Sequence, residues 1–238
     1  MRRQGGRVTR REVLEWLGRS ATLALGADLV SLSRSLAGPV PDADDPRFEF
    51  RPGELPPDRR AGWPVRTVDP QDLSALLARW RLAIDGLVDR PRTYSFPELL
   101  ELPLTDQVTD FHCVEGWSVD DVPWTGVGLG LVLDRARVRP GATHVNLHTA
   151  GGKYNESLPL AVAREPRTLL AYGAVGRTLP LDHGFPLRAV IPRLLGYKNA
   201  KHVERIELSD RPLSGFWVAA GYPYGGEVPA ARLRPGKF

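Results

Sequence analysis

Cysteine is almost absent from this chain of 238 residues, in which Cys113 is the only one. A single thiol excludes an intrachain disulfide and any zinc or iron–sulfur site that needs several protein thiolates. Three roles remain for Cys113: a core filler, a nucleophile, or the one protein ligand of a soft metal that another molecule mostly holds. Because polar Asp110, His112, Glu115 and Ser118 lie within five residues of it, a functional role is favoured.

Several common sequence signatures are also missing. No Gly-x-Gly-x-x-Gly follows a predicted strand and no Walker loop occurs, so neither nucleotide-binding fingerprint applies. A single cysteine also excludes the Cys-x-x-Cys-His motif of covalently bound haem. The net charge is +4, but the basic residues are scattered, with no RNA-binding signature and no helix-turn-helix pattern. The charge therefore favours an anionic ligand over nucleic acid as a partner.

Long apolar runs are scarce, and the N-terminal one is interrupted by charges such as Arg19 and Asp28, which make it too polar to span a membrane. It follows the paired arginines of Thr9-Arg10-Arg11 and ends at Ser35-Leu36-Ala37, a pattern typical of a cleavage site. We therefore predict a twin-arginine-type signal over residues 1–38, the alternative being an amphipathic, arginine-rich first helix. The signal predicts export through the twin-arginine route to the periplasm or cell exterior, with retention at the membrane if it stays uncleaved.

Proline and glycine are plentiful, with 22 and 24 residues, and they favour turns and short strands over long helices. Residues 39–70 are rich in proline, aspartate and arginine, which predicts an irregular linker or wrapping arm outside the core. The chain has 42% hydrophobic and 25% charged residues, as globular proteins do. We predict that residues 71–238 form a single domain.

Within that domain, short strands alternate with short helices. Alternating side chains predict a half-buried strand over residues 80–85, and Ser95-Phe96-Pro97-Glu98 is a capping box that predicts a helix over residues 96–101. Further strands are predicted over residues 105–113, 143–149, 169–174, 187–191 and 202–208, and further helices over residues 125–138 and after an N-cap at Ser157. This pattern indicates an α+β or mainly β mixed fold, not a doubly wound sheet.

Two segments of the second half combine glycine turns with cations: His183-Gly184-Phe185-Pro186-Leu187-Arg188 and Gly196-Tyr197-Lys198-Asn199-Ala200-Lys201. The glycines permit close backbone approach, and Arg188, Lys198 and Lys201 would form an anion clamp, because the arginine fork suits phosphate. The alternative is two ordinary hairpin turns with surface lysines. A third segment, residues 149–160, has two glycines and a tyrosine after a strand end, as a ligand-binding loop would.

The chain resembles the molybdopterin-binding domain of the sulfite oxidase superfamily at five successive motifs. They are Cys113-Val114-Glu115-Gly116-Trp117-Ser118, Pro123-Trp124-x-Gly126, the segment from Thr149 to Ser157-Leu158-Pro159-Leu160, Gly184-x-Pro186-Leu187-Arg188 and Gly196-Tyr197-Lys198. The resemblance covers residues 63–217 and is strongest to the exported bacterial branch that includes the catalytic subunit of protein-methionine-sulfoxide reductase. It implies a mixed, mainly β fold of the sulfite oxidase type.

The resemblance also implies a molybdenum–molybdopterin enzyme that transfers an oxygen atom. Cys113 would be the thiolate ligand of molybdenum, with the other sulfur ligands supplied by one molybdopterin. By position, six residues would hold the pterin and its phosphate: Thr149, His183, Arg188, Asn199, Ala200 and Lys201. Glu115, a second catalytic residue, would line the pocket mouth with Trp117 and Trp124. The implied partners are a small-molecule or sulfoxide-type substrate and a haem electron-transfer protein at or near the membrane.

Two departures from the family bear on the substrate. Animal and plant sulfite oxidases have Cys-x-Gly-Asn-Arg, whose arginine helps to attract sulfite, whereas this stretch holds Glu115 and would repel an anion. The reductase subunit has an Asn-Asn-Phe-Tyr-Glu-Phe-like stretch that contacts the pterin. Residues 46–66 lack it, so the resemblance carries over neither that contact nor the methionine sulfoxide substrate.

Two other functions are compatible with the residues. One is an exported domain of the same fold that binds a ligand without redox turnover, which would contain no molybdenum. The other is a thiol hydrolase, in which Cys113 would pair with one of the histidines and would be labelled covalently by iodoacetamide without loss of any metal. The candidate histidines are His144, His148, His183 and His202.

Overall fold

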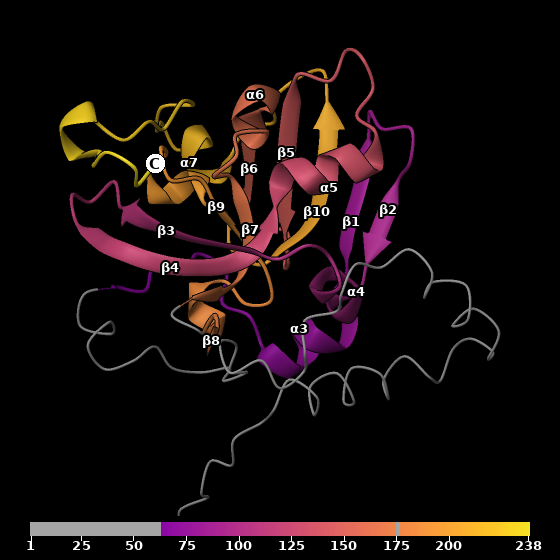
Figure 1. Cartoon of the computed structure of the whole chain (residues 1–238), viewed down its shortest axis with the longest axis horizontal. Helices are drawn as coiled ribbons and strands as arrows, with labels where there is room; N and C mark the ends of the chain where they lie inside the picture. Colours follow the sequence, from indigo (N-terminus) through magenta and orange to yellow (C-terminus); the bar gives the residue numbers. More distant parts are fainter. Residues whose placement is uncertain (1–62, 175–176) are drawn as a thin grey trace, which may run out of the picture.

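The computed structural model describes residues 63–174 and 177–238 and contains two five-stranded sheets (Figure 1). The first sheet has the order β2 (Arg92–Tyr94), β1 (Leu82–Gly86), β10 (Val203–Ser209), β5 (His144–Thr149) and β6 (Asn155–Pro159). The second has the order β3 (Thr105–His112), β4 (Ser118–Gly128), β7 (Leu169–Ala174) and β8 (Arg177–Thr178), and β9 (Arg188–Val190) also pairs with β7. Buried side chains of both sheets belong to one hydrophobic core.

The helices are short and connect or flank the strands: α3 (Leu73–Arg79), α4 (Phe96–Leu100), α5 (Leu129–Ala136), α6 (Leu160–Ala163), α7 (Phe216–Ala219), and the 3-10 turns η2 (Leu181–His183), η3 (Gly196–Lys198) and η4 (Ala230–Arg232). The capping box forms as predicted, because Ser95 caps the backbone N–H of Glu98 and the Glu98 carboxylate accepts from the Ser95 N–H. In the ranges that the structure describes, no helix has the length and apolarity needed to cross a bilayer.

One parallel pairing joins the beginning of the domain to its end. β1 pairs with β10 in parallel, whereas every other pair of neighbouring strands described here is antiparallel. The second sheet is therefore built almost entirely by the chain that lies between β1 and β10. This connection places the end of β3 and the turns before and after β9 on the same side of the molecule, where the candidate site lies.

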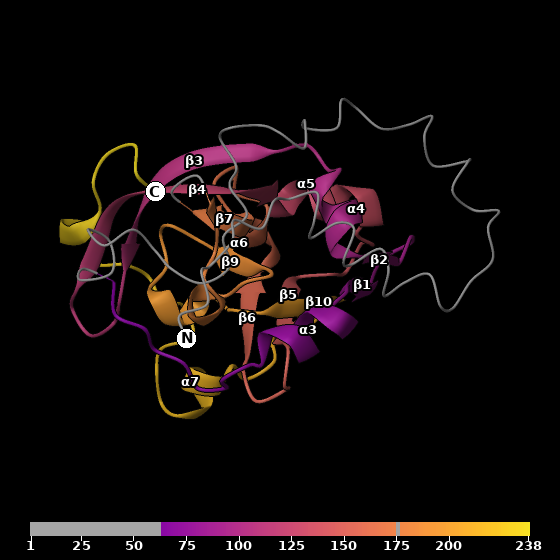
Figure 2. The same ribbon diagram turned by 90° about the horizontal axis from the view of Figure 1, so that it is seen from below.

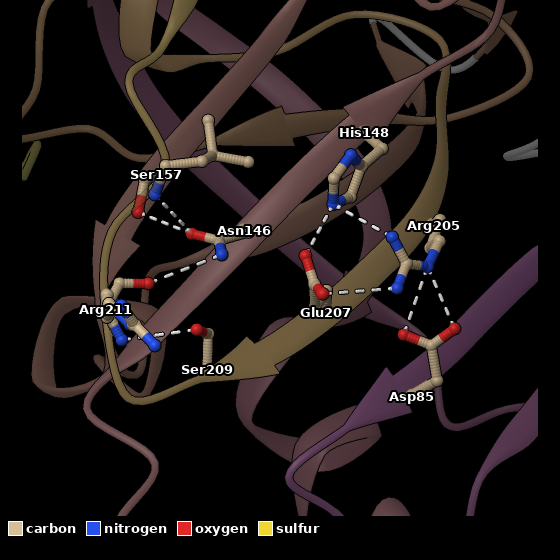
Figure 3. A network of polar contacts seen from close by, with 9 residues as sticks. Asp85, Asn146, His148, Ser157, Arg205, Glu207, Ser209 and Arg211 are labelled. Carbon is tan, nitrogen blue, oxygen red and sulfur yellow. Dashed lines mark hydrogen bonds and ion pairs between the residues drawn. The ribbon is translucent and has the colours of Figure 1, made fainter.

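One face of the first sheet carries a network of polar contacts (Figure 3). Arg205 on β10 donates from Nε to both carboxylate oxygens of Asp85 on β1, and His148 on β5 lies 2.9 Å from Glu207. Asn146 lies on this face as well and accepts a hydrogen bond from Ser157. The predicted alternation in residues 143–149 is confirmed, because His148 and Asn146 share this face while Val145 and Leu147 are fully buried on the other.

Most predicted strands and the mixed, mainly β class are confirmed, but two helix predictions are wrong in part. Residues 125–128 belong to β4 rather than to the helix, because they pair with β3 on one side and β7 on the other. Ser157 lies within β6 and does not cap a helix, since its hydroxyl is bonded across the sheet to Asn146, and α6 begins after Pro159. In both places long-range pairing overrides a local preference.

The predicted arm has a larger role than expected. Its described part, residues 63–70, contains neither helix nor strand, but Trp63 is 3% exposed and belongs to the core, so the placement of the whole arm outside the core was wrong. Figure 2 shows this indigo segment crossing the molecule from the β3–β4 hairpin toward α7 and α3. The predicted signal over residues 1–38 and the arm up to residue 62 lie outside the described residues and stay predictions.

Gly126 provides a test of the pairing between β4 and β7. A Cβ at this position would come within 2.2 Å of the Leu170 carbonyl oxygen, whereas a Cβ on Gly128 would meet nothing within 4 Å. We expect Gly126→Ala to lower the free energy of unfolding by about 2 kcal/mol or more, because the strands must separate. The matched control Gly128→Ala should change it by less than about 1 kcal/mol. Urea unfolding followed by circular dichroism measures both, and equal stability of the two variants would contradict the described pairing.

Candidate functional site

A cavity of about 360 Å³ opens where the ends of both sheets meet. Six segments line it: the arm residues 63–69, the end of β3 with the turn after it, the end of β5 with the turn before β6, the residues around β9, the stretch from η3 to β10, and aromatic residues in and just after α7. Among the predicted site residues, seven of eight line this cavity: Cys113, Glu115, Thr149, His183, Arg188, Asn199 and Lys201. The eighth, Ala200, is buried beside it and holds β9 in place by accepting a hydrogen bond from the Ala189 N–H.

Cys113 directly follows β3, at the start of a tight turn. Its N–H donates to the Trp117 carbonyl at 2.9 Å, and the Gly116 N–H donates back to the Cys113 carbonyl at 3.2 Å. Gly116 has a φ of +97°, which favours glycine. Burial raises the pKa of the Cys113 thiol, while the backbone N–H groups of Glu115 and Val114 point at the sulfur and oppose that rise. The turn thus presents a sulfur to the cavity with donors that suit a thiolate.

The C-terminal segment clamps this turn from outside (Figure 1). Arg232 donates to the carbonyl oxygens of Cys113 and Trp117, at 3.2 and 3.0 Å. Arg234 forms a double ion pair with the buried carboxylate of Asp110, two residues before His112. Residues at the end of the chain therefore fix the position of the only cysteine.

Glu115 stands at the mouth of the cavity between two donors. Arg66 donates from Nε to its two carboxylate oxygens at 2.9 and 3.0 Å, and Trp117 donates from its indole nitrogen at 2.8 Å. These hydrogen bonds, that of Arg66 first, hold the pKa of Glu115 below its usual range. The carboxylate is therefore ionised and compensated.

Arg188 is the deepest cation of the site. It is 1% exposed, and its guanidinium carbon lies 5.2 and 5.3 Å from the ring centres of Phe111 and Trp124. One nitrogen donates to the His183 carbonyl at 2.8 Å, while Nε is buried without a partner. Burial lowers the pKa of Arg188 to about 10, so it remains charged at neutral pH.

Lys201 places a second positive charge next to it. Its ammonium donates to the carbonyl oxygens of Arg66 and Asp182. Burial, and then repulsion by Arg188, lowers the pKa of Lys201 to about 7. Gly184 makes this crowding feasible, because a Cβ there would lie 2.9 Å from the Cβ of Arg188 and 3.2 Å from that of Lys201. At this pKa about half of the Lys201 groups are charged at neutral pH, and an anionic ligand beside Arg188 would favour the charged form.

His183 is buried with both ring nitrogens unpartnered. Burial, followed by the charges of Arg188 and Lys201, lowers its pKa to about 3, so the ring is neutral and offers one donor and one acceptor. Its ring packs edge-on against Trp63, with ring centres 4.7 Å apart. Unpaired buried polar atoms are costly, and their presence beside a cavity points to a ligand that pairs with them.

Comparisons with known proteins show to which family this chain belongs. Residues 66–217 match the model of the oxidoreductase molybdopterin binding domain family. The chain belongs to this family. An uncharacterized oxidoreductase of Bacillus subtilis, YuiH, is 34% identical over 177 residues, which cover 74% of this chain and 89% of the relative. The protein-methionine-sulfoxide reductase catalytic subunit MsrP of Burkholderia mallei is 32% identical over 185 residues, or 71% of this chain and 52% of the relative.

The MsrP subunit of Ralstonia nicotianae is 29% identical over 75% of this chain, and 55% of that subunit is covered. The chain thus spans about half the length of the MsrP relatives it matches. Among solved structures, the sulfane dehydrogenase SoxCD of Paracoccus pantotrophus superposes with a TM-score of 0.53 and 26% identity, over 57% of this chain and 39% of that chain. The predicted superfamily, fold type and molybdopterin-dependent oxidoreductase class are confirmed.

The residues of this family member fit molybdopterin and its metal. Cys113 brings a soft sulfur to the cavity that would bind a metal as the thiolate, Arg188 and Lys201 place positive charge where a phosphate would be held, and His183 offers ring nitrogens without partners. Thr149 and Asn199 line the same cavity, but their side chains are already engaged. The Thr149 hydroxyl donates to the Tyr154 carbonyl, and the Asn199 side chain accepts from the Ile191 N–H at 2.6 Å.

Two further expectations were wrong. Lys198 does not join the anion clamp, because its fully buried ammonium is 2.6 Å from Glu156 and donates to the Ser157 carbonyl. Trp124 does not line the mouth, since it is 1% exposed and packs behind Arg188. Charge suggested a clamp role for Lys198, and the resemblance implied a mouth position for Trp124, but the packing of η3 and of β4 buries both side chains.

The predicted ligand loop does bring its tyrosine, Tyr154, to the cavity, but the lining role of the arm and of Trp217 and Tyr222 was not predicted. Trp63, Arg66 and Asp69 line the cavity from the arm, and Tyr154, Tyr197, Trp217 and Tyr222 line it from the other segments. Tyr197 and Trp217 lie within 5.3 Å of Tyr222, measured between ring centres. A tryptophan in a proline-rich stretch was the one available signal for the arm, because long aromatic side chains are rarely left in solvent.

The buried ion pair between Lys198 and Glu156 offers a test of the packing that supports the cavity. Lys198 and Glu156 are both fully buried, and the neighbours of Lys198 in η3 line the cavity. We expect Lys198→Met to lower the free energy of unfolding by about 3 kcal/mol or more, since it leaves a buried carboxylate unpaired. The double variant Lys198→Met, Glu156→Gln should recover part of that loss. Urea unfolding measures both, and a double variant less stable than the single one would refute the pairing.

Proposed function

We propose that this protein is a molybdenum oxotransferase in which Cys113 is the only protein ligand of the metal. The observation that carries the proposal is the shared cavity, which one thiol, the buried Arg188, the half-buried Lys201 and an unpartnered histidine all line. A soft thiolate suits molybdenum, and a single protein sulfur suffices where an organic dithiolene supplies the others. The cations match the charge of the phosphate on such a cofactor.

The bound cofactor would supply the two-electron chemistry of oxygen-atom transfer. The chain's own groups would bind the cofactor and orient it. Cys113 would hold the metal from the β3 side, while Arg188 and Lys201 would neutralise the phosphate from the β9 side. His183 would pair its two free nitrogens with the pterin. The aromatic residues of the wall would keep water from the cavity, which strengthens each of these interactions.

The substrate that we favour is an uncharged sulfoxide. Relatives named as protein-methionine-sulfoxide reductase catalytic subunits support this choice. In the reaction the S–O bond breaks, sulfur keeps the electron pair as a sulfide, and oxygen leaves as water after taking up two protons. The two electrons would come from a haem partner at the membrane, and a reduced viologen dye supplies them in an assay. Export by the twin-arginine route remains part of the proposal.

The thiol hydrolase finds less support in the site. His112, the histidine next to Cys113, has its Nδ1 2.7 Å from the Ser118 hydroxyl. Among the hydrogen bonds described for residues 63–174 and 177–238, none joins the Cys113 sulfur to a histidine. Burial also raises the pKa of this thiol, which is the opposite of what activates a cysteine nucleophile.

Replacement of Cys113 tests the proposed ligand. Purified from a host that makes the cofactor, the wild type should contain about one molybdenum atom per chain, since one thiolate binds one metal. Cys113→Ser should lower the rate of sulfoxide reduction by more than about 100-fold, because loss of an outer-shell partner alone costs up to roughly that factor. The variant should retain most of the pterin. Metal analysis, pterin fluorescence and viologen oxidation measure these quantities. Wild-type turnover by the variant, or a wild type without molybdenum, would reject the assignment.

Replacement of Arg188 tests the proposed phosphate contact. Arg188→Ala should speed loss of the pterin by about tenfold or more, because a charge-assisted hydrogen bond is removed. The matched control is Arg193→Ala, which removes a guanidinium that pairs with Glu165 and Glu227 and does not line the cavity. Pterin content is measured during dialysis, and circular dichroism confirms that both variants fold. Equal retention by the two variants would contradict the contact.

A further inference from the structure

Arg66 and Glu115, here called the mouth pair, come from segments that lie 49 residues apart in the chain and meet at the opening of the cavity. Their side chains are 60% and 43% exposed, so the pair borders solvent. Both also line the cavity that Cys113 lines. A substrate that enters beside this pair comes within range of both charges on its way to the sulfur.

The position of Arg66 is built into the fold. Its carbonyl accepts a hydrogen bond from the Lys201 ammonium at 2.7 Å, and Trp63, three residues earlier, is buried against His183 and Trp124. The guanidinium meets the carboxylate through Nε at 2.9 and 3.0 Å, and Nη1 donates to the Val65 carbonyl. The arm is thus held at two points, and Arg66 is directed toward Glu115.

Glu115 is held equally well on its other side, by the indole N–H of Trp117 at 2.8 Å. An exposed ion pair of this kind adds little to the stability of a fold. Its main physical effect is on charge, because each partner cancels the field of the other at the opening. The other two cations that line the described cavity, Arg188 and Lys201, are engaged with backbone carbonyls deeper inside.

We propose that the mouth pair sets the net charge of the cavity opening to zero and thereby selects uncharged oxygen-atom donors over oxyanions. Arg66 is then a specificity-determining residue, and Glu115 has a second task, which is to keep Arg66 from attracting anions. The inference rests on the proposed function for the nature of the substrate. It modifies the expectation that Glu115 repels anions, because Arg66 neutralises that carboxylate.

Charge variants of the purified holoenzyme test this idea, with sulfate as an inhibitor of the reduction of methyl phenyl sulfoxide by reduced viologen. Glu115→Gln should lower the inhibition constant of sulfate, relative to the KM of the sulfoxide, by about fivefold or more, since one unit charge about 4 Å away in water contributes about 1 kcal/mol. Arg66→Gln should raise that ratio by a similar factor. The double variant Arg66→Gln, Glu115→Gln, again without net charge, should return within about threefold of the wild type.

A second ion pair provides the matched control. Arg139 and Asp89 pair at 2.8 Å with side chains 52% and 58% exposed, and neither lines the cavity. Asp89→Asn changes the total charge as Glu115→Gln does, so it should leave the sulfate ratio unchanged. Shifts in the same direction for Glu115→Gln and Arg66→Gln would indicate disturbed packing and overturn the proposal. So would an equal shift for Asp89→Asn.

Sulfate binding measured by calorimetry on the same holoenzymes separates this inference from the proposed function. If the wild type contains molybdenum but reduces no sulfoxide, the proposed substrate fails while the affinities still rank the variants. We expect Glu115→Gln to bind sulfate most tightly, the wild type and double variant to be intermediate, and Arg66→Gln to bind it most weakly. Any other order refutes the role of the mouth pair.

Discussion

The burial of the Arg188 guanidinium among aromatic rings shapes the rest of the site. A charge inside a protein is costly unless other groups compensate it. Here the rings of Phe111 and Trp124 and one backbone carbonyl provide that compensation within the described chain, and Nε is left free. A site of this kind holds positive charge ready for an anion, and binding of a phosphate would recover part of the cost of burial.

The cavity combines three environments within a short distance. Its depth is positive through Arg188 and Lys201, its wall on one side carries the Cys113 sulfur, and its opening is electrically neutral through the mouth pair. This difference in charge between the depth and the opening separates two tasks, retention of the cofactor and admission of the substrate. The deep cations can retain a phosphorylated cofactor, while the neutral opening does not concentrate other anions from solution.

The arm connects these environments. Trp63 packs against His183 at the depth of the cavity, Arg66 reaches Glu115 at its opening, and Lys201 donates to the Arg66 carbonyl. A segment without helix or strand thus forms one wall of the site. Irregular segments supported by a rigid scaffold commonly carry function, because their backbone can follow a ligand closely.

Local signals in the sequence were sufficient to predict several strands, one capped helix and part of the candidate site. The lone cysteine, the glycine turns and the cations beyond them, together with the resemblance to a known family, predicted eight site residues, and seven of these line the cavity. Such residues can be predicted from short motifs because ligands, turns and charges depend on residue type. Alternation of apolar side chains predicted β5 and β10, and the capping box predicted α4. The tertiary structure alone decided which side chains are buried and which distant segments meet. Lys198 pairs with Glu156 in the interior, residues 125–128 extend β4, and Arg66 meets Glu115. These outcomes depend on contacts between segments far apart in the chain, whose free energy exceeds local preferences and leaves no trace in a short stretch of sequence.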